Sequence, residues 1–91
     1  MKTYTATFSD GSTHSKNSKS KKGFPFAALT TTADGSYSVS FSHSKKSLAN
    51  NHHLNIRMAK EVLEYETDQN LIKILENDLT GTIEIVETVV S

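Results

Sequence analysis

The chain contains no cysteine, and this absence removes several classes of protein. No disulfide can crosslink the fold, no thiolate can attack a substrate, and zinc modules with cysteine ligands are excluded. Glycine is also scarce: four isolated glycines provide no glycine-rich loop that could hold a phosphate group. Long apolar runs are missing as well, so we expect neither a membrane span nor a secretory signal.

A single small domain over residues 1–91 remains. Leu, Ile, Val and Phe together account for 21 of the 91 residues, which is just above the level typical of disordered chains. At 10.0 kDa the chain has the length of one domain. So small a core without disulfides has little net stability, which leaves a homodimer open as a way to add to it.

The formal net charge of zero hides an uneven distribution along the chain. Residues 1–60 carry nine Lys or Arg and two Asp, a net charge of +7. Residues 61–91 carry one Lys and eight Asp or Glu, a net charge of −7. Two interpretations stay open: the halves face each other and neutralise, or the surface has two poles that attract partners of opposite charge.

Alternation of polar and apolar residues predicts strands in the first half. Residues 2–8 alternate threonine with apolar side chains, residues 36–42 alternate serine with apolar side chains, and residues 24–32 form a further strand. Asp-Gly turns at 10–11 and 34–35 separate alternating segments, because glycine adopts the positive φ that tight turns need. These features predict an antiparallel meander.

The segment between the first two strong strands is polar. Residues 12–17 could return as an edge strand, although they hold no apolar side chain. Residues 15–22 are basic and of low complexity, so we predict a loop there. Pro25 lacks an N–H donor and belongs at the start or edge of a strand.

The second half changes to helical spacing. Ser44 can cap a helix that covers at least residues 55–65 and could begin near Lys45, unless Asn50-Asn51 splits it. Residues 70–79 fit a second helix, capped by Asp68, better than a hairpin, and residues 82–90 form a strand. The expected fold is α+β: a small antiparallel sheet, made of the N-terminal meander plus the C-terminal strand, packed by one or two helices.

No set of residues has the spacing that catalysis or metal binding needs. The histidines are His14, His43, His52 and His53, and they form no H-x-x-x-H or H-E-x-x-H pattern. None of the 12 serines and 11 threonines lies in a G-x-S-x-G motif, and the S-x-x-K spacing at 18–21 and 42–45 occurs without the S-D-N and K-T-G motifs that accompany it in enzymes. We therefore expect no enzyme, and we assign no catalytic residue, cofactor or metal.

The acidic half provides the first candidate binding surface. Its carboxylates would suit a basic groove on a protein partner, and a protein is the partner we expect first. Glu84 and Glu87 complete the acidic half in the last strand. The candidate partner-binding residues are Glu61, Glu64, Glu66, Asp68, Glu76 and Asp78.

The alternative is a single-stranded nucleic-acid-binding protein. Lysines beside strand aromatics hold phosphates while bases stack on the rings. Residues 22–26, Lys-Gly-Phe-Pro-Phe, resemble the K-G-F-G-F core of cold-shock and RRM-type strands, with Pro25 in place of a glycine. The candidate residues for this function are Lys16, Lys19, Lys21, Lys22, Phe24, Phe26 and Lys45.

The first half also resembles small uncharacterised bacteriophage proteins, which combine short "fSdG" hairpins with an "S-x-S-x-x-L-A" entry into a helix. The residues that carry the resemblance are 4–11, 26–28, 34–35 and 41–49. The resemblance implies an accessory protein of a phage or mobile element, acting in the cytoplasm of the host. Such proteins bind and block a host or defence factor without chemistry of their own.

Overall fold

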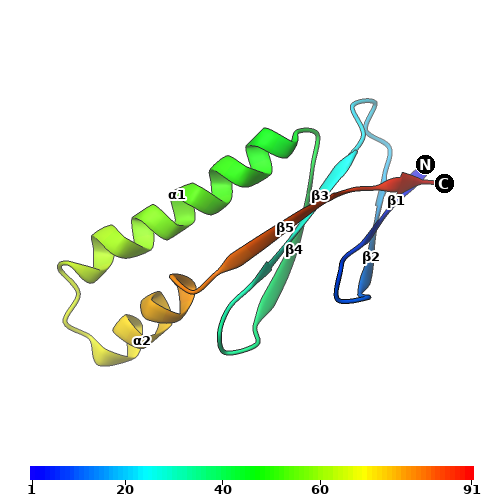
Figure 1. Ribbon diagram of the computed structural model, residues 1–91. Coiled ribbons are helices and arrows are strands. Elements are labelled where there is room, and N and C mark those ends of the chain that lie inside the picture. Colours follow the sequence, from blue (N-terminus) through cyan, green and yellow to red (C-terminus); the bar gives the residue numbers. More distant parts are fainter.

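The N-terminal strands form one small sheet. In the computed structural model, which describes residues 1–91, β1 (Lys2–Thr7) lies between β2 (Thr13–Ser18) and β6 (Val89–Val90) and is antiparallel to both (Figure 1). The predicted alternation of β1 is confirmed, because Tyr4 and Ala6 are buried. We call this sheet A.

The loop predicted over residues 15–22 is wrong in its first half. Residues 15–18 belong to β2, whose backbone pairs with β1 from Thr7↔Thr13 to Lys2↔Ser18. An edge strand with one wet face needs no apolar residue, because its neighbour provides the backbone hydrogen bonds. The connecting segment is therefore shorter and runs from residue 19 to residue 25.

The remaining strands form a second sheet, which we call sheet B. Its central strand is β3 (Phe26–Thr31), flanked by β4 (Tyr37–Ser42) and β5 (Thr82–Glu87), and every pair is antiparallel. The predicted C-terminal strand is divided, so that β5 joins sheet B and β6 joins sheet A. Thr88 lies at the break, where its hydroxyl donates to the Phe24 carbonyl oxygen at 2.7 Å.

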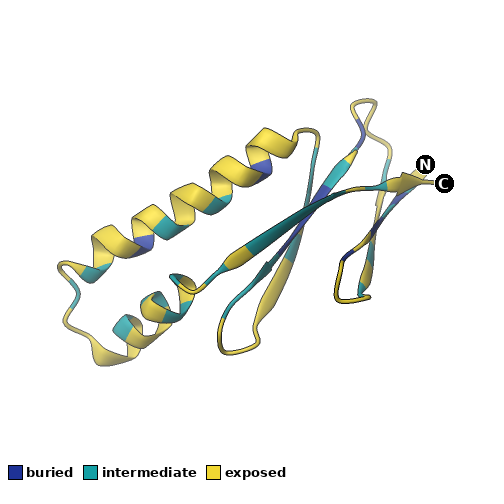
Figure 2. Cartoon of the chain, viewed as in Figure 1, coloured by how far each residue is buried: buried dark blue, intermediate teal, exposed yellow.

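The core lies between the two sheets. Phe8 and Leu29 are buried there together with Ala6 and Ala27, while Val39, Phe41 and Val86 pack around them. Figure 2 shows buried residues in β3 and β1, whereas most of the helical surface is exposed. Burial of these apolar side chains between the sheets is the main stabilising contribution to the fold.

Two helices follow β4, and the predicted N-caps are confirmed. α1 (Lys45–Leu63) is continuous through Asn50-Asn51, and the Ser44 side chain accepts a hydrogen bond from the Ser47 N–H. α2 (Gln69–Asp78) is the helix favoured over a hairpin, and the Asp68 carboxylate accepts from the Asn70 N–H at 2.9 Å. The chain is thus α+β, with two small sheets and two helices.

The helices cover sheet B only loosely. α1 buries Leu48 and Ala59, and α2 buries no residue. The chain measures 48 × 25 × 17 Å with a radius of gyration of 15.2 Å, against about 12 Å for a compact domain of this length. Its accessible surface is 6318 Å², compared with about 5200 Å² for a compact protein of this mass. Neither helix is long and apolar enough to cross a membrane.

Candidate functional site

The two ends of the molecule differ in charge. The turn between α1 and α2 lies at one end, and sheet A with both chain termini lies at the other (Figure 1). Four carboxylates surround the turn, and we call them the acidic tip: Glu61, Glu64, Glu66 and Asp68. The only salt bridge, Arg57 to Glu61 at 3.5 Å, lies within α1. This ion pair joins the basic half of the sequence to the acidic half, whereas no ion pair links the lysines of sheet A with the acidic tip.

The other predicted acidic residues lie away from this tip. Glu76 and Asp78 are in the last turns of α2, where Asp78 lines a groove beside sheet B. Glu84 joins the sheets, because its carboxylate accepts from the Ser9 N–H at 3.0 Å and the Ser9 hydroxyl at 2.8 Å. Glu87 is exposed at the end of β5. The acidic surface is therefore smaller than the sequence indicated.

The carboxylates of the tip differ in their local roles. Glu66 accepts from the N–H groups of Thr67 and Asp68 at 3.0 and 2.9 Å, and Asp68 caps α2. These bonds fix the turn between the helices. Glu64 forms no side-chain hydrogen bond or ion pair, and Glu61 contacts only the exposed Arg57. Glu61 and Glu64 are thus the carboxylates that a partner can engage without disturbing the turn.

Exposed apolar side chains lie among these carboxylates, and sequence reasoning missed them as a site. Tyr65 is 81% exposed at the end of α1, and Val62 and Met58 are exposed one and two turns before it. The signal available in the sequence was Tyr65 itself, a large aromatic placed between Glu64 and Glu66 beyond the last helical turn.

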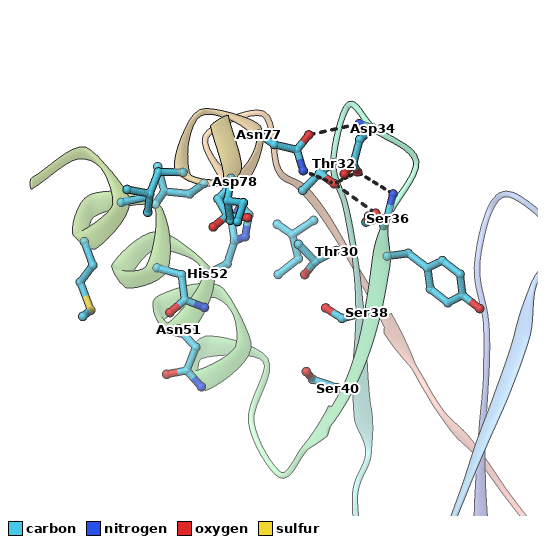
Figure 3. A pocket seen from close by; sticks show the side chains of 18 of the residues that line it. Thr30, Thr32, Asp34, Ser36, Ser38, Ser40, Asn51, His52, Asn77 and Asp78 are labelled. Carbon is cyan, nitrogen blue, oxygen red and sulfur yellow. Dashed lines mark hydrogen bonds between the residues drawn. The ribbon is translucent and has the colours of Figure 1, made fainter. Parts of the chain in front are cut away.

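A groove of about 1010 Å³ separates the helices from sheet B. Figure 3 shows Thr30, Ser38 and Ser40 on the sheet side, opposite Asn51 and His52 of α1. Ser38 and Ser40 of β4 are exposed, so the helix does not cover them. The groove is open and has one hydroxyl-rich wall, and the charged residues that line it are Asp34, Lys73 and Asp78.

One end of this groove is closed by a polar network. Asp34 in the β3–β4 turn accepts from the Thr32 hydroxyl at 2.7 Å and from the Ser36 N–H at 2.8 Å (Figure 3). Asn77 of α2 accepts from the Asp34 N–H at 3.2 Å and donates to the Thr32 hydroxyl at 3.1 Å. The Ser36 N–H and then the Thr32 hydroxyl lower the pKa of Asp34 to about 2. The network joins α2 to sheet B.

The aromatic ring expected to stack on nucleic-acid bases is covered. His43 stacks on Phe24 with ring centroids 4.8 Å apart, and Lys16 Nζ lies 4.5 Å from the centre of the same ring. Tyr4 meets Phe24 edge-on at 5.8 Å. Because His43 and Lys16 both lie against the ring, an incoming base would have to displace one of them to stack on Phe24.

The other residues of the nucleic-acid candidate do not form a continuous surface. Lys19, Lys21 and Lys22 are exposed in the segment between β2 and β3, whereas Lys45 begins α1. Phe26 is half-buried in β3. The structure therefore places lysines near one another at the sheet A end without a free aromatic ring between them.

The four histidines are dispersed. The ring of His14 lies about equally far from those of Phe8 and Tyr37, at 5.9 and 6.0 Å between centroids, and His43 packs on Phe24. His52 lines the groove, and His53 is exposed on α1. No three His, Asp or Glu side chains lie close enough together to hold a metal ion.

Comparison with known proteins finds no family model, curated protein or solved structure that matches this chain. Any function proposed for the chain therefore rests on its own sequence and geometry.

Proposed function

We propose that this chain is a non-catalytic binding protein whose acidic tip engages a basic surface on a macromolecular partner. The observation that carries the proposal is the combination at the end of α1: Tyr65 and Val62 are exposed, and carboxylates surround them. An exposed aromatic anchor within a polar rim is the usual anatomy of a protein–protein interface. Carboxylates at the rim accelerate and orient association with a basic partner.

The partner is a protein. Nucleic acids and anionic membranes carry negative charge and are repelled by four carboxylates at one tip. The resemblance of residues 4–11, 26–28, 34–35 and 41–49 to phage proteins supports a host or defence factor. A groove that normally holds nucleic acid has the basic surface required. Binding at such a groove would inhibit or modulate the factor by occupying it.

A comparison of matched charge reversals tests the proposal. The tagged chain is used to capture proteins from a host lysate, alongside the variant Glu61→Lys/Glu64→Lys and the control Glu87→Lys. Glu87 is exposed on β5, so its reversal makes the same chemical change away from the acidic tip. The expected result is a retained protein that the double variant loses and the Glu87 variant keeps. Equal retention by all three proteins would contradict the proposal.

Tyr65→Ala provides a second test that does not depend on charge. Because Tyr65 is 81% exposed, its removal leaves the fold unchanged, whereas loss of an aromatic anchor weakens an interface by about 2 kcal/mol or more. The same proteins are titrated into labelled single-stranded DNA and RNA at low salt. Binding that disappears with Lys19→Ala/Lys21→Ala/Lys22→Ala would instead support the nucleic-acid alternative.

A further inference from the structure

The outer edge of β4 is an open strand edge. β4 has β3 on one side and no strand on the other. The Thr32 N–H donates to the Ser36 carbonyl oxygen at 3.0 Å, which fixes the phase of the β3–β4 ladder. Because an antiparallel ladder alternates, Ser38 and Ser40 direct their N–H and C=O groups toward β3. The backbone groups of Tyr37, Val39 and Phe41 therefore point outward to the free edge.

This edge lacks the features that normally prevent strands from pairing. Natural edge strands are protected by charged residues, proline or bulges. The edge strand β2 contains Lys16, and the edge strand β5 contains Glu84 and Glu87. β4 has the sequence Tyr-Ser-Val-Ser-Phe-Ser, with neither a charged residue nor proline. Among the longer edge strands, β4 alone is unprotected.

The sequence of β4 is also symmetric about Val39. Residues 36–42 read Ser-Tyr-Ser-Val-Ser-Phe-Ser, so that residues equally far from Val39 are of the same kind. In an antiparallel pair of identical strands centred on Val39, Tyr37 lies opposite Phe41 of the second copy. Ser38 then lies opposite Ser40 of that copy. A two-fold axis needs a self-complementary surface, and this strand provides one.

We propose that two copies of this chain pair through β4 in this register, which joins the two copies of sheet B into one continuous sheet. The outward N–H and C=O groups of Tyr37, Val39 and Phe41 then bond to those of the second copy. Tyr37, which is 67% exposed, packs across the junction on an aromatic ring. The single copy exposes 6318 Å² of accessible surface, which is about 1100 Å² more than a compact protein of this mass exposes. A chain that buries further area on association would show such an excess.

A charge swap on the serine face tests both the dimer and its register. Ser38 and Ser40 are exposed on the groove side of β4, so charged side chains there reach solvent in the single copy. Ser38→Lys/Ser40→Lys places a lysine opposite a lysine of the second copy at both cross-strand pairs. Their repulsion raises the dissociation constant of the dimer by on the order of tenfold. Ser38→Lys/Ser40→Glu opposes unlike charges in the proposed register and restores the dimer.

The measurement is sedimentation equilibrium from about 1 μM to about 1 mM protein, with circular dichroism as a check that each variant folds. The wild type is expected to reach twice the chain mass of 10.0 kDa. The double-lysine variant is expected to stay monomeric up to higher protein concentrations. When it is mixed with Ser38→Glu/Ser40→Glu, the two variants are expected to form a mixed dimer. A wild type that stays monomeric throughout overturns the proposal. A dimer that the double-lysine variant forms equally well overturns the proposed interface.

Discussion

Gly23 shows how one residue controls the junction between the loop and the sheets. It has a φ of +68°, and a Cβ atom built on it would lie 2.7 Å from the Tyr4 hydroxyl oxygen. Both the backbone conformation and the lack of a side chain are needed, because Tyr4 is buried and packs on Phe24. The Gly23 carbonyl oxygen also contacts the His43 ring. Gly23 therefore helps to keep the rings of Tyr4 and His43 in contact with Phe24.

Gly23→Ala is expected to destabilise the fold more than Gly35→Ala. Both positions have positive φ, which costs alanine about 1–2 kcal/mol. Only Gly23 adds a steric clash, since a Cβ at Gly35 meets no atom within 4 Å. Urea unfolding followed by circular dichroism gives the free energy of unfolding of each variant. Equal losses at the two positions would contradict the close approach of Tyr4.

Asp34 is expected to make stability depend on pH in acid. Its pKa is about 2 in the folded chain and 3.8 in the unfolded one, because the Ser36 N–H and the Thr32 hydroxyl stabilise the carboxylate. The unfolded chain therefore binds a proton first as the pH falls. The contribution of Asp34 is complete above about pH 4 and is lost between pH 4 and pH 2.

The variant Asp34→Asn isolates this effect, since the amide oxygen can still accept hydrogen bonds while the titrating group is removed. Asp10 also has a lowered pKa and titrates in both proteins, because Ser12, whose N–H donates to the Asp10 carboxylate at 2.8 Å, stabilises the charged form. Thermal unfolding at several pH values is expected to show a steeper loss of stability in the wild type than in Asp34→Asn. Parallel curves below pH 4 would exclude this role for Asp34.

At the scale of elements, α2 depends on its cap and on two contacts with the β3–β4 turn. Asp68 caps its first turn, while Asn77 and Thr80 hold its end against that turn. Since α2 buries no residue, these polar contacts contribute much of what positions it. The acidic tip depends on the same helix, so the cap and the charge of Asp68 must be separated experimentally.

The variants Asp68→Ala and Asp68→Asn separate the capping role of Asp68 from its charge. Removing the cap is expected to lower the free energy of unfolding by about 1 kcal/mol, whereas asparagine caps about as well as aspartate. Asp68→Asn should therefore leave stability unchanged while it removes one charge from the tip. Circular dichroism during urea unfolding measures both variants, and a loss of stability with asparagine as large as with alanine would contradict a capping role.

The elements were predictable because their signals are local. Alternation identified β1 and β4, and cap residues identified the start of α1 and of α2. β2 was missed in part because an edge strand paired on one side carries no apolar pattern. The division of residues 82–90 into β5 and β6 was not predictable, since it depends on which distant strands each part meets.

At the scale of the whole molecule, the sequence predicted two halves of opposite net charge but not where their side chains lie in the fold. Glu84 belongs to the acidic half of the sequence, yet it joins the two sheets through Ser9. Phe24 belongs to a promising basic segment, yet His43 and Lys16 cover its ring. Both outcomes depend on contacts between residues far apart in the chain. The acidic tip itself was partly predictable, because it is built from neighbouring residues of one helical hairpin.

The binding role of the acidic tip is tested by the affinity of the captured partner for Glu64→Lys, compared with its affinity for Glu87→Lys. Glu64 has no side-chain partner within the chain, so its reversal changes the acidic tip and leaves the fold intact. We expect Glu64→Lys to weaken partner binding by about tenfold or more at low salt, and Glu87→Lys to change it by less than about twofold. Equal losses for the two variants, or no loss for Glu64→Lys, would contradict a binding surface at the acidic tip.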